Sequence, residues 1–168
     1  MGAPKKQRKQ FEAPKRLWDA ARIKEERKLV DEYGLKNMRE LWRMKTILRK
    51  IRREARRLQS AKGQKIEERT ALLLNRVKSF LISDPKSLDE VLALDTHSIL
   101  ERRLQTRIVR SHLASTMLQS RQFIAHGHVA VKNSRVTAPS YLVKFNEETA
   151  VGWYKEPIVI TNEVTVNK

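Results

Sequence analysis

The sequence predicts an α+β fold, in which a basic N-terminal helical region precedes a small module of two helices packed on a short hairpin sheet. Two observations predict this class. Apolar residues recur at intervals of three and four through most of the chain, the period of helices buried along one side. Alternating apolar residues, typical of strands, follow Gly127. Separately, the absence of cysteine excludes disulfides and thiolate zinc sites.

The charge of the chain limits its possible partners. Its 168 residues include 36 Lys and Arg against 19 Asp and Glu, a formal net charge of +17. Because such a charge repels itself, we expect a polyanionic partner, either nucleic acid or an anionic membrane surface. No apolar run is long enough to span a bilayer and no apolar segment follows the basic start, so we expect a cytoplasmic protein without membrane insertion.

The charge gathers in two regions. Residues 1–60 carry 20 basic and eight acidic side chains, residues 61–99 carry six of each, and residues 100–150 carry eight basic and three acidic. Together with the periodicity, this predicts four segments in chain order: a basic extended arm over 1–16, a helical domain over 17–95, a compact module over 96–150, and short C-terminal strands with a tail over 151–168.

The arm has two prolines and few apolar residues, so it cannot bury enough surface to fold alone. A solvated tail without a role is the alternative. If the arm binds a polyanion, the cations at its start are the candidates for phosphate contact: Lys5, Lys6, Arg8 and Lys9.

Two helices are predicted next. The first runs from Leu17 to Tyr33 and is ended by Gly34. Asn37 and Glu40 resemble a capping box that opens the second. Its apolar residues share one stripe: Leu41, Met44, Leu48, Ile51, Ala55 and Leu58. Its other faces carry candidate phosphate ligands: Arg49, Lys50, Arg52, Arg53, Arg56 and Arg57. A merely solvated basic face is the alternative, although like charges on one helix repel.

A third amphipathic helix is predicted from Ile66 to Phe80, stopped by Asp84-Pro85. Ser87 with Glu90 caps a short helical turn. Thr96 or Ser98 then caps a helix in which Leu100, Leu104 and Ile108 recur at four-residue spacing. The arginines of this helix are expected on another face: Arg103, Arg107 and Arg110.

Thr116 with Gln119 predicts another helix, with Met117, Ser120 and Ile124 inward and Gly127 at its end. Val129 to Val131 forms a strand, Lys132-Asn133-Ser134 turns, and Val136 begins the return. Tyr141, Val143 and Phe145 alternate as another strand. Further edge strands are predicted from these residues: Val151, Trp153, Ile158 and Ile160.

We find no pattern typical of an enzyme, metal site or cofactor site. His126 and His128 lack a nearby carboxylate or thiolate that would complete a zinc site, so they more plausibly shape the turn or donate to phosphate. No glycine-rich phosphate loop or Ser/His/Asp grouping is present. The three tryptophans could pack in the core or stack on bases. Arginine-rich helices beside a small β element favour folded RNA over DNA, since few amides are placed to read base edges.

Residues 100–145 resemble the S-four RNA-binding domain family. The resemblance rests on Glu101-Arg102-Arg103-Leu104-Gln105-Thr106, Leu113-Ala114, Arg121 with Ile124, His126 to Val131, and Pro139 to Val143. With the preceding basic helices, the likeness covers nearly the whole chain and extends to the small-subunit ribosomal protein S-four family, in its archaeal and eukaryotic-type form. The sequence departs at His112, where glycine is usual, at Ser120, where alanine is usual, and at Lys132-Asn133, where Asn-Gly is usual.

The resemblance implies a non-enzymatic protein that binds small-subunit ribosomal RNA (rRNA) directly, nucleates assembly of the subunit body and contributes to translational accuracy through neighbouring ribosomal proteins. It makes 17–95 an rRNA-binding domain and 96–150 the S-four-type domain. In that domain the implied RNA-facing residues are Arg102, Arg103, Arg107, Arg110, Arg121, His126, His128, Lys132 and Arg135. Arg103→Lys is expected to weaken binding, because lysine cannot make a bidentate phosphate contact.

Three other functions stay open on the sequence alone. An RNA-modifying enzyme could use the same module, but no stretch is large enough for its catalytic domain. A factor that recycles stalled ribosomal particles would bind RNA transiently. A basic membrane-surface protein would bind anionic vesicles as well as structured RNA at equal salt.

Overall fold

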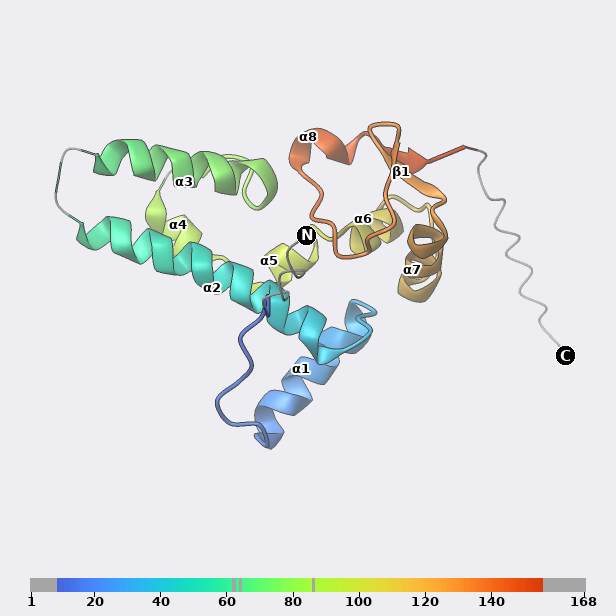
Figure 1. Cartoon of the computed structure of the whole chain (residues 1–168), viewed down its shortest axis with the longest axis horizontal. Helices are drawn as coiled ribbons and strands as arrows, with labels where there is room; N and C mark the ends of the chain where they lie inside the picture. The colour runs from blue at the N-terminus through green and yellow to red at the C-terminus, as the bar shows by residue number, and fades with distance from the viewer. Residues whose placement is uncertain (1–8, 62, 64, 86, 156–168) are drawn as a thin grey trace, which may run out of the picture. The chain divides into compact units, whose positions relative to one another are not determined.

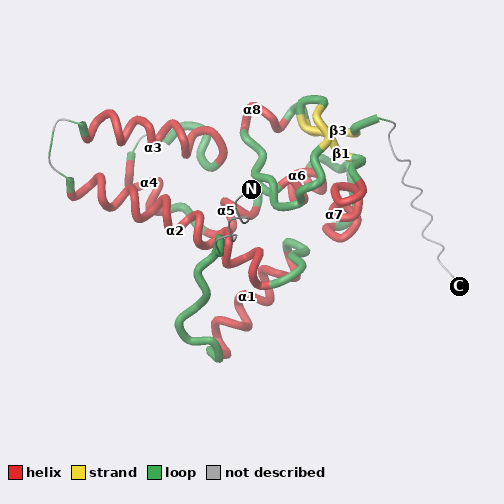
Figure 2. Tube along the Cα trace, viewed as in Figure 1, coloured by secondary structure: helices red, strands yellow, loops and turns green. Residues whose placement is uncertain are grey.

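The computed structural model describes residues 9–61, 63, 65–85 and 87–155. It confirms the α+β class, with helices in both halves and one small antiparallel sheet (Figures 1 and 2). Lys5, Lys6 and Arg8 lie outside the described residues. The chain divides into two compact units, 1–102 and 103–168, so the division falls after the position expected from the charge pattern.

The first unit is built around α2 (Met38–Ser60). The other helices of the unit pack on it: α1 (Ala20–Glu32), α3 (Ile66–Phe80), α4 (Leu88–Ala93) and α5 (Thr96–Leu100). The predicted stripe is buried from Leu41 to Ala55, while Leu58 is half-buried. A long helix with one continuous apolar stripe can therefore serve as the axis of this core.

Capping side chains set several helix starts. Asn37 Oδ1 accepts a hydrogen bond from the Glu40 amide at 3.2 Å, and Ser87 Oγ accepts one from the Glu90 amide at 3.4 Å, as predicted. The start of α1 differs from the prediction. Asp19 accepts from the Arg22 amide at 3.3 Å, so the helix begins at Ala20 and leaves Leu17 outside.

The predicted helix through Leu100, Leu104 and Ile108 is wrong. α5 ends at Leu100, and α6 (Leu104–Arg110) is a separate helix. Between them Arg103 is extended and forms an isolated bridge with Leu142, and the Leu104 amide donates to the Tyr141 carbonyl at 2.8 Å. This non-local backbone pairing outweighs the helical periodicity.

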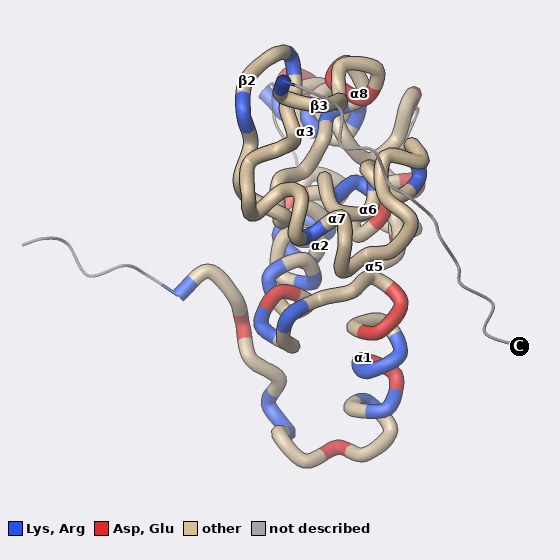
Figure 3. Tube along the Cα trace, turned by 90° about the vertical axis from the view of Figure 1, so that its right-hand side faces the viewer, with Lys and Arg blue, Asp and Glu red and all other residues tan. Residues whose placement is uncertain are grey.

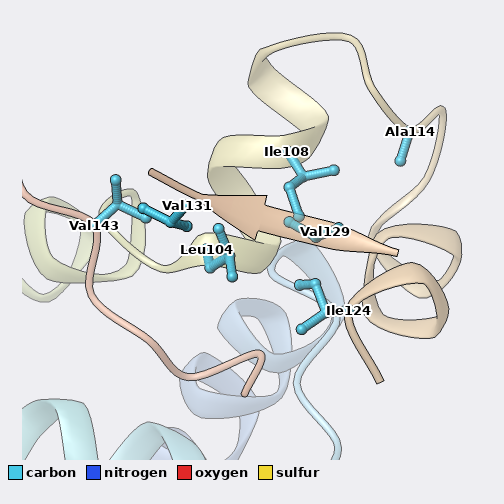
Figure 4. Packing of buried hydrophobic residues seen from close by; sticks show 7 residues of the cluster. All are labelled: Leu104, Ile108, Ala114, Ile124, Val129, Val131 and Val143. Atoms are coloured by element: carbon cyan, nitrogen blue, oxygen red, sulfur yellow. The ribbon is translucent and has the colours of Figure 1, made fainter. Parts of the chain in front are cut away.

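The second unit places α6 and α7 (Met117–His126) against a sheet of order β2-β1-β3. Its strands are β1 (Val129–Val131), β2 (Ser134–Arg135) and β3 (Val151–Trp153), all antiparallel. Side chains from both helices and from β1 meet in one core (Figure 4). The buried members of that core are Leu104, Ile108, Ala114, Ile124, Val129, Val131 and Val143.

Three non-glycine residues of the described chain have left-handed backbone, and all three lie in this unit. His112 has φ 57°, Lys132 has φ 50° and Asn133 has φ 62°. The resemblance leads us to expect glycine at the positions of His112 and Asn133, and glycine adopts positive φ without strain. The hairpin turn consists of Lys132 and Asn133 alone, so Ser134, predicted within the turn, instead pairs with Val131.

The predicted strand from Tyr141 to Phe145 is wrong. Leu142 makes only its bridge, and Phe145 opens a short helix, α8 (Phe145–Glu148). Glu147 Oε2 accepts from the Lys144 amide at 3.3 Å, and this local bond favours the helical turn over a ladder. β3 confirms the strand predicted around Val151 and Trp153, whereas Ile158 and Ile160 lie outside the described residues.

Candidate nucleic-acid interface

The cations of α2 line a groove of about 460 Å³ in the first unit. Its lining is Lys45, Leu48, Arg49, Arg52, Arg53, Arg56 and Thr96. Figure 3 shows basic positions recurring along α2. Five cationic side chains around one groove create a strongly positive potential, which favours an anionic occupant. This groove brings together four of the six α2 residues predicted from the sequence, while Lys50 and Arg57 are exposed elsewhere on the helix.

A carboxylate of the arm already binds to this groove. Glu12 pairs with Arg49 and lies 3.9 Å from Arg53. The Glu12 amide also donates to Thr46 Oγ1 at 3.0 Å, which anchors the arm on α2. The arrangement shows that the groove accepts an oxyanion, and that Arg49 and Arg53 can converge on one. Sequence reasoning missed Glu12, because an isolated acid in a basic arm carries no periodic signal.

Lys9 and the following aromatic residue lie beside the same helix. Lys9 Nζ lies 4.6 Å from the centroid of the Phe11 ring, and that ring lies 5.9 Å from the Trp42 ring. Lys9 is exposed. The described end of the arm therefore presents a cation next to the basic helix.

Two predicted RNA-facing arginines are buried instead. Arg103 has no exposed surface and Arg102 is almost fully buried. Burial also lowers the pKa of the Arg102 guanidinium. The expected exposed face for Arg103 is wrong because the residue lies in the extended segment between α5 and α6 rather than on a helix surface. The Arg103 side chain is therefore buried and not displayed for a direct phosphate contact.

The remaining helix arginines of the second unit differ in exposure. Arg107 pairs with Glu148, while Arg110 is exposed. Arg121 Nη1 donates to Gln105 Oε1 at 3.4 Å. The buried Gln105 also donates to the Met117 carbonyl at 2.9 Å and thus ties α6 to α7. Gln105 was missed as a supporting residue, and its polarity on an otherwise apolar helix face was the available signal.

The end of α7 and the hairpin present further polar groups. His126 and His128 are exposed, with stacked rings whose centroids lie 6.3 Å apart. Arg135 crosses Gly127: a Cβ added to Gly127 would lie 3.0 Å from Arg135 Cδ. Glycine therefore leaves the room through which the Arg135 side chain passes. Across the described ranges, no group of three metal-ligating residues could hold an ion.

Lys132 is held by a buried carboxylate. Glu147 accepts hydrogen bonds from Lys132 Nζ at 3.3 Å and from the Tyr141 hydroxyl at 2.8 Å. Burial alone would raise the pKa of Glu147, but hydrogen bonds from Tyr141, the Lys144 amide and Lys132 outweigh it and hold that pKa below its usual value. Burial, with the bond to Glu147, raises the pKa of Tyr141.

None of the described helices is both long enough and apolar enough to cross a membrane. Each of the two units instead presents basic side chains. Some of these cations are exposed, and others are paired with carboxylates. In the first, three exposed and two half-buried cations line a groove, and in the second, Lys132 and Arg135 lie on the hairpin, with Arg135 beside the end of α7. Phosphate and irregular RNA are ligands that such surfaces fit.

Comparison with known proteins agrees with this geometry. The family model of the S4 domain matches residues 102–148. The small ribosomal subunit protein uS4 of Methanococcus aeolicus is 46% identical over 91% of this chain and 88% of its own length. The uS4 proteins of Methanococcus vannielii and Methanothermobacter thermautotrophicus are 42% and 41% identical, over 96% and 92% of this chain and 93% and 91% of their own lengths. The chain belongs to the uS4 family of small ribosomal subunit proteins.

Proposed function

We propose that this chain is a structural constituent of the small ribosomal subunit that binds small-subunit rRNA directly through both units. The observation that carries the proposal is the groove of α2, where five cations line one surface in a chain that also carries an S4 domain. Phosphate neutralisation by such cations releases counterions, which drives binding.

The first unit contributes the groove and the arm to this interface. Its proposed RNA contacts are Lys5, Lys6, Arg8, Lys9, Arg49, Lys50, Arg52, Arg53, Arg56 and Arg57. In the free protein the Glu12 carboxylate binds Arg49 and Arg53. A phosphate of the RNA displaces it, because carboxylate and phosphate accept hydrogen bonds from the same guanidinium groups.

The second unit contributes a surface at the end of α7 and along the hairpin. Its proposed direct contacts are Arg107, Arg110, Arg121, His126, His128, Lys132 and Arg135. Arg102 and Arg103 are not proposed as direct contacts, because their burial keeps a phosphate from the guanidinium groups.

Early binding at an RNA junction would let the protein nucleate assembly of the subunit body. Its contribution to translational accuracy would act through neighbouring small-subunit proteins. The role needs no cofactor and no small-molecule substrate, and it places the protein in cytoplasmic ribosomes.

Sedimentation of the native protein from a cell extract tests the proposal. We expect it to travel with the small subunit at low salt and to remain there through a high-salt wash. Release by the wash would favour a ribosome-associated recycling factor. If about eight phosphates are neutralised on the isolated rRNA, the slope of log affinity against log salt should be roughly −6 to −7.

A further inference from the structure

Trp18 is the most exposed large apolar residue of the described chain. Its relative exposure is 93%, and that of the preceding Leu17 is 61%. The other two tryptophans are partly buried: Trp42 lies against Phe11, and the ring centroid of Trp153 lies 5.3 Å from that of Phe123. Because the indole is almost fully exposed beside the exposed Leu17, its ring is available to stack on a partner.

The segment that displays Trp18 is anchored. Arg22 Nη2 donates to the carbonyls of Arg16 and Leu17, at 3.2 and 3.0 Å. Arg22 Nη1 pairs with the buried Glu26 at 2.6 Å. Glu26 in turn accepts from Trp42 Nε1 at 3.1 Å and from Lys45 at 2.8 Å, both on α2. A chain of bonds therefore runs from the core of the first unit to the backbone beside Trp18, which limits the entropy lost when the indole binds.

The surface beside this segment is basic and partly apolar. An open groove of about 530 Å³ on α1 is lined by Ala20, Ile23, Lys24, Arg27, Lys28 and Asp31. Lys15 and Arg16 are exposed just before Trp18. The five cations Lys15, Arg16, Lys24, Arg27 and Lys28 outnumber the exposed acids Glu25, Asp31 and Glu32 together with the capping Asp19 by one. The small positive excess suits a phosphate, while the indole and Ile23 complement a flat apolar group. An unpaired nucleotide has both features, a phosphate and a base with two π faces.

We propose that Trp18 and the basic face of α1 bind an unpaired nucleotide of the small-subunit rRNA, with the base stacked on the indole. This inference rests on the proposed rRNA-binding function and extends it to a site outside the α2 groove and the S4 domain. RNA is favoured over an acidic protein because the cations flank a single exposed ring, the arrangement of a stacking platform.

The test compares full-length variants for affinity to the cognate small-subunit rRNA at fixed salt. Trp18→Ala should weaken binding about five-fold or more, and Trp18→Phe should retain most of the affinity, because phenylalanine keeps a stacking face. Leu72→Ala is the matched control, since Leu72 is an exposed apolar residue of the same unit at 69%. Circular dichroism should show equal helix content in all three variants.

Fluorescence supplies an independent readout. The difference between the wild type and Trp18→Phe isolates the Trp18 emission, which acrylamide should quench strongly in the free protein and weakly in the rRNA complex. Unchanged affinity of Trp18→Ala together with full acrylamide access in the complex would overturn the stacking proposal and leave rRNA binding intact. Shielding of Trp18 only in the assembled subunit would assign the site to a protein neighbour and also overturn it. A wild type that does not bind the rRNA would defeat both proposals.

Discussion

The arginines of α2 and those of residues 102–110 are similarly dense in the sequence, yet the structure uses them differently. On α2 they surround a groove, with Arg49 and Arg53 more than half exposed. In the second region Arg102 and Arg103 are buried, Arg107 is paired with Glu148, and Arg110 is exposed. Charge density alone therefore does not identify an RNA-binding surface, because a basic side chain can also build the scaffold beneath one.

The two regions differ in the length of the helix that carries the arginines. α2 has 23 residues, so its apolar stripe fixes which faces remain for the arginines. α6 has seven residues and begins where a strand-like segment pairs with Leu142. Over so short an element, non-local contacts determine which side chains are buried.

The largest expected effect comes from the buried arginine. Arg103→Ala removes a wholly buried side chain and leaves a cavity, so we expect a loss of about 2–4 kcal/mol in the free energy of unfolding. Chemical denaturation measures it. Arg110→Ala, at an exposed position, is the control and should change stability by less than about 0.5 kcal/mol. Equal stability of the two variants would contradict a scaffold role for Arg103.

The buried carboxylate behind the hairpin should give a smaller effect that depends on pH. At neutral pH, Glu147→Gln should cost about 1.5–3 kcal/mol, since hydrogen bonds to a charged group are lost. Because the pKa of Glu147 is lower in the folded state, this stabilisation is present above the unfolded pKa of about 4.3 and is lost as pH falls through the folded value.

Thermal unfolding of the wild type and of Glu147→Gln across pH 3 to 7 measures this dependence. The gap between their melting temperatures should close on acidification. A gap that is constant with pH would show that the charge of Glu147 contributes nothing.

The smallest expected effect on stability tests whether the Arg135 side chain needs the space that Gly127 leaves at the end of α7. Gly127→Ala places a Cβ at a backbone φ of 80° and 3.0 Å from Arg135, for a cost of about 1–2 kcal/mol. The displaced Arg135 should also bind rRNA less well, so the affinity of Gly127→Ala should approach that of Arg135→Gln. Wild-type rRNA affinity in a folded Gly127→Ala variant would remove Arg135 from the interface.

Much of the fold could be predicted where local chemistry determines it. Neighbouring residues in the sequence determine the caps at Asn37 and Ser87, the buried stripe of α2 and the end of α7 at Gly127. The family was identified from its motifs, and the structural, non-enzymatic character of uS4 proteins confirms the prediction that the chain is not an enzyme.

The missed features depend on contacts that periodicity does not encode, two of them between residues far apart in the sequence and one of them a local capping bond. The break before α6 depends on Leu142, which lies far away in the sequence, and the helix at Phe145 depends on a bond from the Lys144 amide to Glu147. Likewise, the Glu12 contact with α2 joins residues 37 positions apart. Periodicity describes one element at a time, so it misses contacts that select between helix and strand or bring an acid into a basic groove.

If both units contribute phosphate contacts to one rRNA complex, charge removed from either surface changes the salt dependence of rRNA affinity. Arg53→Gln with Arg56→Gln alters the groove, and Arg110→Gln with Arg135→Gln alters the second unit. Arg69→Gln with Arg76→Gln removes the same charge from exposed positions on α3. We predict that each of the first two pairs lowers the log–log salt slope by about 1.4–1.8, that the four changes together lower it by roughly 3, and that the α3 pair leaves it nearly unchanged. Equal slopes for all three pairs would show that a diffuse positive charge drives binding and that neither surface contributes specific phosphate contacts.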